Sequence, residues 1–175
     1  MQKLYDRFEK YLPEGASVLD AGCGSGRDSK HFIEKGYTVT AFDASGIMCE
    51  YALMLTGQEV RKLTFQEMDY QDCFDGIWAC ASLLHVPEDE LVSVIKKVIA
   101  ALKPGGVLYA SWKYGKGTRF DDHSGRLFCD MDENNIIRYF SDKDGIQIEE
   151  IWETNDVREN INSQIWLNII VKKCR

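Results

Sequence analysis

Apolar positions along the chain follow two different periods in turn. Segments with apolar residues three or four positions apart predict helices, whereas short runs rich in β-branched and aromatic residues predict strands. The predicted helices lie at 1–12, 28–35, 45–57, 88–102 and around 136–140. The predicted strands lie at 17–21, 37–42, 59–65, 74–81, 107–112, 146–154 and 165–173.

Two of these helices carry enough signal to predict their ends and their buried faces. The helix that follows Pro87 should stop before Pro104, which is followed by two glycines. Its apolar stripe comprises Leu91, Val94, Ile95, Val98, Ile99 and Leu102. Ser45 is a suitable N-cap and Gly57 a suitable end for another helix. The face predicted to pack inward there comprises Met48, Tyr51, Ala52 and Leu55.

The regular alternation of strand and helix predicts the fold class. Right-handed crossovers then place helices on both faces of a mostly parallel, doubly wound, Rossmann-like α/β sheet. The last two strands are too close in sequence for a crossover helix, so we expect an antiparallel C-terminal pair at one end of the sheet. Residues 115–130 lack apolar periodicity, which predicts a mobile lid or a substrate loop. Without a repeat or linker, residues 1–175 are predicted to form one domain.

Composition and charge restrict the partners. A net charge of -7, with 21 scattered Lys and Arg residues, argues against nucleic acid and favours a small-molecule substrate. No apolar run approaches the roughly 20 residues of a membrane span, and the charged N-terminus is unlike a signal peptide, so we expect a cytoplasmic protein that does not enter membranes. Six cysteines without a CxxC pair, together with only three histidines, predict reduced thiols and no metal site.

A glycine-rich loop follows the first predicted strand, where open α/β sheets bind their ligands. Gly22, Gly24 and Gly26 let the backbone turn sharply and approach a ligand closely. Asp43 ends the second strand, 21 residues after Gly22, and could accept hydrogen bonds from two ribose hydroxyls. A dinucleotide fingerprint needs its third glycine one residue later, where this chain has Arg27. This spacing disfavours a nicotinamide-dependent reductase.

A nucleoside with an amino acid end fits the loop better than a pyrophosphate does. S-adenosyl-L-methionine (SAM) offers a carboxylate, which suits Arg27 and backbone N–H groups, and an ammonium, which suits backbone carbonyls and Asp20, directly or through water. A bare glycine turn remains the alternative interpretation of the loop, although Asp43 weakens it.

Four segments in this order resemble the motifs of class I SAM-dependent methyltransferases. They are VLDAGCGSG, VTAFDAS, FDGIWACASLLHV and LKPGGVLYAS, and they span about residues 16–112. Within the family the chain is most similar to small stand-alone bacterial enzymes related to tellurite-resistance-type methyltransferases. Two features depart from the common pattern: Thr64 or Gln66 stands where many members have an acid that contacts the adenine, and the segment before the first strand is short.

The resemblance implies a set of cofactor-binding positions. The loop backbone at Ala21, Gly22, Cys23 and Gly24, with Arg27 or Asp28, would contact the methionine part, and Asp43 would hold the ribose. The remaining implied contacts are Ala44 and Met48 at the adenosine, Thr64 and Phe65 beside the adenine, and Cys80 and Ala81 under the methionine chain and the sulfonium.

The sequence shows no catalytic constellation, and methyl transfer from a sulfonium does not require one. Alignment of nucleophile, methyl and sulfur supplies most of the catalysis, and a general base is needed only for some acceptors. His85 could orient a substrate or accept a proton, or it could cap a loop. Trp112, Lys113 and Tyr114 are further substrate-side candidates, or part of the core.

Several other residues carry less weight, because each has a simple structural explanation. Tyr5 is expected to pack rather than cover the cofactor, His31 to be solvated, and Cys23 to be structural. Loop residues that could bind an anionic substrate, or simply be solvated, are Arg119, His123 and Arg126. We therefore predict a SAM-dependent methyltransferase that acts on a small molecule by in-line transfer. The alternative is a non-catalytic module that binds SAM or S-adenosylhomocysteine.

Overall fold

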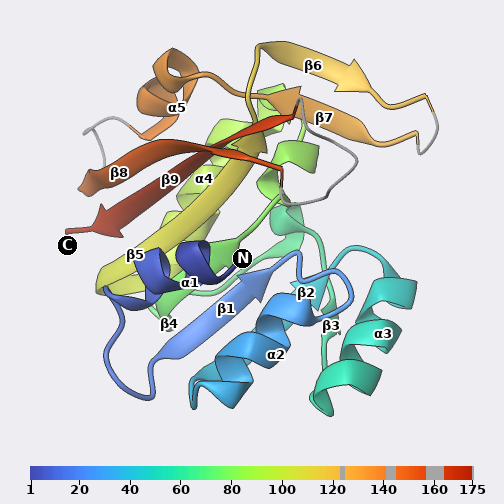
Figure 1. Ribbon diagram of the computed structural model, residues 1–175, viewed down its shortest axis with the longest axis vertical. Helices are drawn as coiled ribbons and strands as arrows, with labels where there is room; N and C mark the ends of the chain where they lie inside the picture. Colours follow the sequence, from blue (N-terminus) through green and yellow to red (C-terminus); the bar gives the residue numbers. More distant parts are fainter. Residues whose placement is uncertain (123–124, 141–144, 157–163, 175) are drawn as a thin grey trace.

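The fold is that of a doubly wound α/β protein, as seen in a computed structural model (Figure 1). The structure describes residues 1–122, 125–140, 145–156 and 164–174. Its main sheet has seven strands in the order β3-β2-β1-β4-β5-β9-β8. Their bounds are β1 Ser17–Ala21, β2 Thr38–Asp43, β3 Arg61–Lys62, β4 Phe74–Ala79, β5 Leu102–Lys113, β8 Ile146–Asn155 and β9 Ile165–Lys173.

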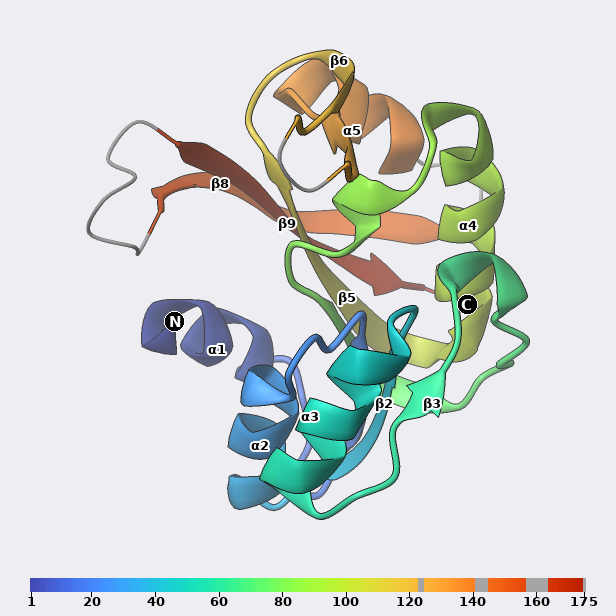
Figure 2. The same cartoon turned by 90° about the vertical axis from the view of Figure 1, so that its right-hand side faces the viewer.

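Helices cover both faces of this sheet, and the two views agree on their placement (Figures 1 and 2). One face carries α1 Gln2–Glu9, α2 Arg27–Glu34 and α3 Gly46–Thr56, and the other carries α4 Glu88–Ala101 and α5 Glu133–Phe140. Five neighbouring strands of the sheet, β3, β2, β1, β4 and β5, run parallel, whereas β9 is antiparallel to both β5 and β8. The predicted fold class and the antiparallel pair at one end of the sheet are therefore confirmed.

Strands buried on both faces explain the unbroken apolar runs in the sequence. Val18 packs on the face of α1 and α2, while Leu19, the next residue of β1, packs on the opposite face. Trp78 and Ile77 divide in the same way on β4. Because neither face is solvated, the period-two alternation of polar and apolar residues disappears.

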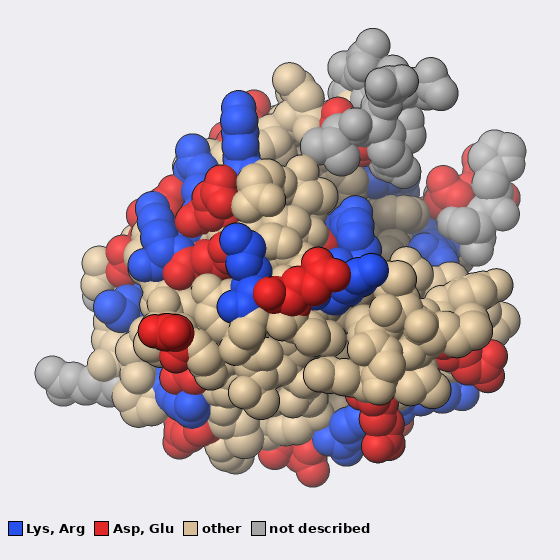
Figure 3. Space-filling view, turned by 60° about the horizontal axis from the view of Figure 1, so that its bottom comes forward, with Lys and Arg blue, Asp and Glu red and all other residues tan. Residues whose placement is uncertain are grey.

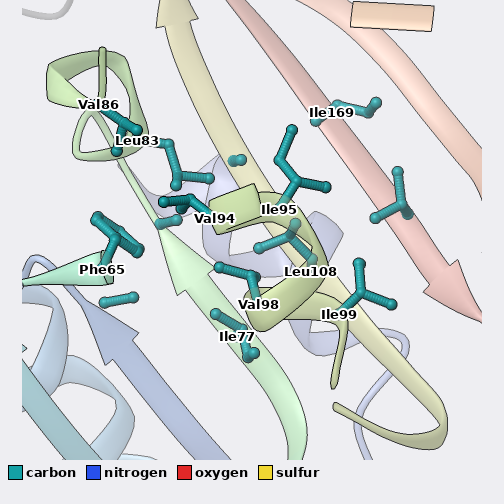
Figure 4. Close-up of a cluster of buried hydrophobic side chains, with 14 of the residues drawn as sticks. Phe65, Ile77, Leu83, Val86, Val94, Ile95, Val98, Ile99, Leu108 and Ile169 are labelled. Carbon is teal, nitrogen blue, oxygen red and sulfur yellow. The ribbon is translucent and has the colours of Figure 1, made fainter. Parts of the chain in front are cut away.

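The helix α4 buries its predicted stripe against the sheet, as Figure 4 shows for Val94, Ile95, Val98 and Ile99. Leu102 is a correction, since the backbone is already extended there and β5 begins at that residue. Its side chain is still fully buried in the same cluster. The apolar period therefore continued one residue beyond the end of the helix.

Two further segments differ from the expectation. The strand predicted at 59–65 is reduced to two residues of β3, because Thr64 caps a short 3-10 turn, η1 Phe65–Glu67, through its bonds with Glu67. Residues 115–130 are not a structureless loop, since they contain the antiparallel strands β6 Gly117–Phe120 and β7 Leu127–Asp130. This hairpin is a separate two-stranded sheet beside the main one (Figure 1).

The predicted caps of α3 are present, but its predicted inner face is only partly right: Ala52 is buried as predicted, whereas Tyr51 and Leu55 are exposed. Ser45 Oγ accepts a hydrogen bond from the Met48 N–H, and Gly57 closes the helix in the left-handed conformation. Cys49 and Ala52 are the buried residues, whereas Tyr51 is 51% exposed. The helix is apolar nearly all round, so its sequence does not show which side packs.

Charged side chains of both signs are interspersed on the face of the protein seen in Figure 3.

Candidate functional site

The glycine loop lies at the carboxyl ends of β1 and β2, and all three of its glycines have positive φ. The N–H groups of Gly22 and Cys23 donate to the Phe42 carbonyl at 2.9 and 3.0 Å, which fixes the loop to the end of β2. A Cβ on Gly26 would lie 2.9 Å from Ala52, so the third glycine lets α2 approach α3 closely. Gly24 has open space beside its Cα, which leaves this part of the loop accessible to a ligand.

Asp43 is held at the end of β2 by backbone donors on both carboxylate oxygens. Its Oδ2 accepts from the Gly24 N–H at 2.9 Å, and its Oδ1 accepts from the Ser45 N–H at 2.8 Å. Each oxygen has a second lone pair that is available to a further donor. A vicinal diol such as a ribose could donate one hydroxyl to each.

A first cavity of about 480 Å³ opens between the glycine loop, the start of α3, η1 and the segment after β4. The predicted residues that line it are Gly22, Gly24, Asp43, Ala44, Met48, Thr64, Phe65, Ala81 and His85. Other residues that line it had no predicted ligand contact; they include Ser45, predicted only as a helix cap, and Leu63, Ser82, Val86 and Leu127. Most of these residues are adjacent in sequence to a predicted cofactor-binding residue, and this adjacency is the sequence signal that could have identified them.

A second cavity of about 280 Å³ lies on the side of the sheet that carries α1. It is lined by the predicted Arg27, Cys80 and Ala81, and also by Tyr109, Ser111 and Trp166, among others. Ala81 lines both cavities, and its φ of 52° is unusual for a residue with a side chain. Both cavities therefore reach Ala81, just after the end of β4.

Two predicted carboxylates lie beneath the loop and are occupied by protein donors. Asp28, 6% exposed, accepts from Tyr5 Oη, Trp78 Nε1 and the Arg27 guanidinium. These donors lower its pKa in spite of burial, which acts in the opposite direction. Asp20 accepts from Ser29 Oγ at 2.6 Å. Burial, together with the negative charge of Asp28, raises the pKa of Asp20 to about 8. Ala21, whose carbonyl accepts from Ser82 Oγ, is fully buried.

His85 lies in the short turn η2 Leu83–His85 and contacts the hairpin. Its Nδ1 is 2.7 Å from the Leu127 carbonyl oxygen, which can only accept, so Nδ1 carries the hydrogen and Nε2 keeps a lone pair. Burial lowers the pKa of His85, so the ring is neutral at pH 7. The ring also meets Phe128 edge-on at 4.8 Å between centroids. A neutral imidazole at the wall of the first cavity can accept a proton.

The other substrate-side candidates lie outside both cavities. Trp112 is fully buried, and its Nε1 has no hydrogen-bond partner within the described part of the chain, so it belongs to the core. Lys113 stacks on Phe128, with Nζ 3.9 Å from the ring centroid. Tyr114 is 39% exposed and donates to Glu133. Of the two interpretations left open for Trp112, substrate-side residue or part of the core, its complete burial agrees with the core.

Several minor expectations are also resolved. Tyr5 packs, as expected, but His31 is not solvated: its ring stacks on Tyr5 at 3.7 Å, and its Nε2 lies 2.6 Å from Glu9 Oε1. Arg119 pairs with Asp130, whereas Arg126 lines the first cavity. His123 lies outside the described residues.

The cysteines near the loop are poor nucleophiles. Burial raises the pKa of Cys80 to about 12 and that of the buried Cys23 thiol even further, so both stay protonated at neutral pH. Across the described ranges, no three His, Cys, Asp or Glu side chains group as metal ligands would. None of the helices that the structure describes is long and apolar enough to cross a membrane.

Comparison with known proteins places the site in context. Residues 18–106, half of the chain, match the family model described as methyltransferase domain. The chain is 27% identical over 165 residues to the putative methyltransferase YqeM of Bacillus subtilis, covering 86% of this chain and 60% of that protein. It thus spans less than two thirds of the length of this curated relative.

Solved structures with the same fold include enzymes with ligands bound. The 1,6-didemethyltoxoflavin-N1-methyltransferase of Burkholderia thailandensis, solved with 1,6-didemethyltoxoflavin and S-adenosylhomocysteine, has a TM-score of 0.82 at 24% identity and covers 99% of this chain and 78% of its own. TehB from Haemophilus influenzae has a TM-score of 0.78 at 17% identity, covering 100% of this chain and 62% of its own. Both structures are less than 25% identical to this chain, so these likenesses show the shared fold.

Proposed function

The chain belongs to the methyltransferase-domain family, and on that premise we propose that it transfers the methyl group of SAM to a small-molecule acceptor. One observation carries the proposal. The Asp43 carboxylate and the accessible Gly24 backbone face one cavity, which suits a ribose joined to an amino acid end. The sequence between them offers Arg27 where a dinucleotide site needs glycine.

The lining residues divide naturally among the parts of SAM. The adenine would lie beside Thr64 and Phe65, with Ala44 and Met48 along the adenosine, and the ribose would bind Asp43. The methionine chain would pass Ala81 toward Arg27 and Cys80 in the second cavity. Asp20 is buried and lines neither cavity, so backbone carbonyls of the loop would receive the ammonium.

When bound, SAM would supply a methyl group on a sulfonium, which leaves as a neutral thioether when an acceptor lone pair attacks the carbon. The protein then has to hold the acceptor in line with the methyl and exclude water. Ala81 lines both cavities, so we place the methyl group there. His85 Nε2, on the wall of the first cavity, would accept the proton that an amine or hydroxyl acceptor must lose.

A small, flat acceptor suits the surfaces around this point. Tyr109, Trp166 and Ser111 line the second cavity, so it offers two aromatic side chains and a hydroxyl. The Burkholderia thailandensis enzyme of the same fold was solved with a small heterocycle, which supports this substrate class.

The proposal is tested in two steps. Calorimetric titration with SAM and, separately, with NAD should show binding of SAM alone; micromolar NAD binding without SAM binding would instead favour a reductase. Labelled SAM is then incubated with thiol, amine, hydroxyl and metalloid acceptors. Transfer to one of them is expected, while tight SAM binding without transfer to any acceptor would favour the non-catalytic module.

A further inference from the structure

Asp28 is a buried carboxylate whose hydrogen bonds are all made to side chains of this chain. Oδ1 accepts from Tyr5 Oη at 2.6 Å and from Arg27 Nε at 2.6 Å. Oδ2 accepts from Arg27 Nη2 at 3.0 Å and from Trp78 Nε1 at 2.9 Å. These donors come from α1, the start of α2 and β4, so one carboxylate joins three elements that surround the second cavity.

The hydrogen bonds from Arg27 to Asp28 fix the orientation of the Arg27 guanidinium. The Arg27 side chain is 59% exposed and would otherwise sample many rotamers, yet Nε and Nη2 are both held by the carboxylate beside it. A guanidinium is planar, so fixing two of its nitrogens fixes the third. Arg27 lines the second cavity, and Nη1 makes no hydrogen bond to the described residues.

The aromatic lining of the second cavity is tied to the same carboxylate. Trp78 donates to Asp28 and stacks on Tyr109, with 4.0 Å between ring centroids, and Tyr109 lines the second cavity. Tyr5 is 5% exposed and packs against Trp78 at 5.3 Å between centroids. The guanidinium and the aromatic wall are therefore fixed relative to one another.

We propose that Asp28 is a positioning residue, which aims the Arg27 guanidinium at the carboxylate of the methionine end of SAM. This inference rests on the proposed function, because it assumes that SAM is the ligand. It replaces a direct role of Asp28 with an indirect one: the side chain touches Arg27 rather than the cofactor. A carboxylate that Arg27 binds through a fixed donor pays less ordering entropy than one bound by a mobile side chain.

The test compares SAM with decarboxylated SAM, which keeps the amine and the sulfonium but lacks the carboxylate. Asp28→Asn keeps the size of the side chain but loses the negative charge that holds Arg27. Its Kd for SAM should rise by about tenfold or more. Its Kd for decarboxylated SAM should stay within about twofold of the wild-type value. An effect transmitted through the charge of Asp20 or through general loosening would change the Kd of both ligands alike and would overturn the inference.

A double-mutant cycle tests whether the effect passes through Arg27. Arg27→Met should weaken SAM binding at least as much as Asp28→Asn does, and the double variant should be no weaker than Arg27→Met alone. Additive losses would contradict the inference. Tyr5→Phe is the matched control, since it removes one bond to Asp28 but neither of the Arg27 bonds, and it should leave the preference for SAM intact. Circular dichroism melts identify any variant that fails to fold.

The two proposals fail in different ways. If the wild-type protein binds neither SAM nor S-adenosylhomocysteine, the proposed function is wrong. If the wild-type protein binds SAM and decarboxylated SAM equally well, the proposed function stands, but Arg27 does not recognise the carboxylate and the role inferred for Asp28 is wrong.

Discussion

Asp43 Oδ2 lies 2.9 Å from the Gly24 nitrogen, so the residue that ends β2 also holds the glycine loop after β1. The second oxygen of the same carboxylate holds the Ser45 N–H at the start of α3. One side chain therefore sets the distance between the loop and the helix on either side of the first cavity. Its removal should affect both the shape of the cavity and its charge.

Asp43→Ala is expected to weaken SAM binding strongly. Charge-assisted hydrogen bonds are worth roughly 1.5 to 3 kcal/mol each, so the loss of even one of the two should raise the Kd by about 10- to 100-fold, and the loss of both should raise it further. Isothermal titration calorimetry of the folded variant measures the change. Asp69→Ala removes an exposed acid outside the lining of the cavity and serves as the control. Unchanged affinity in a folded Asp43→Ala variant would remove Asp43 from the ribose site.

Gly26→Ala should destabilise the fold more than Gly36→Ala, although the two glycines have nearly the same φ, +86° and +87°. An added Cβ meets Ala52 at 2.9 Å at the first position and nothing within 4 Å at the second. Left-handed strain of about 1 to 2 kcal/mol is common to both, and overpacking adds about 1 to 3 kcal/mol at Gly26. Urea denaturation gives the two free energies of unfolding, and equal losses would contradict the close approach of α2 and α3.

The stability of the ligand-free protein should fall as pH rises through the range in which Asp20 titrates. The pKa of Asp20 is about 8 in the folded state, against 3.8 for an ordinary aspartate side chain, so the folded state binds the extra proton between these values. Stability from this group is fully present below about pH 4 and is lost as pH rises to about 8. The slope approaches about 1.4 kcal/mol per pH unit.

Asp20→Asn isolates this contribution, because the amide oxygen can still accept from Ser29 Oγ. The difference in unfolding free energy between wild type and variant should change with pH between 5 and 8, as measured by urea denaturation at several pH values. Asp69→Asn, at an exposed acid, provides the comparison. A pH-independent difference for Asp20→Asn would show that this carboxylate ionises normally.

Methyl transfer to an acceptor that loses a proton should decline at acid pH with a midpoint below 6.5, since burial lowers the pKa of His85 below that value. His85→Phe, which keeps a ring against Phe128 but removes the base, should lower kcat and abolish this acid limb. The SAM Kd should change little. Rates at a series of pH values with saturating SAM give the profile, and an unaltered acid limb in the variant would assign it to another group.

Much of the fold could be predicted because its decisive signals are local. Gly57 and Ser45 mark the ends of α3 through cap geometry, and β1 and β4 are recognisable as short apolar runs. The hairpin was missed because all four residues of β6 are exposed, which leaves no apolar alternation to detect. It is held by backbone pairing and by cross-strand contacts such as Arg119 with Asp130.

Some residues of the candidate site could likewise be predicted from local sequence, and others could not. The residues predicted at the first cavity follow strand ends in the sequence, where topology dictates that they converge. Sequence position does not predict that Tyr5 contacts Asp28 or that Glu9 contacts His31, because Tyr5 and Glu9 lie on a helix about twenty residues earlier. Such contacts depend on how α1 packs across α2, which no local pattern records.

The bond from His85 to the hairpin uses the main-chain oxygen of Leu127 rather than a side chain. A carbonyl group is present whatever residue occupies position 127. Substitutions of the hairpin side chains that keep the backbone of β7 in place would therefore leave the hydrogen on Nδ1 of His85, while they change the side chains beside the first cavity.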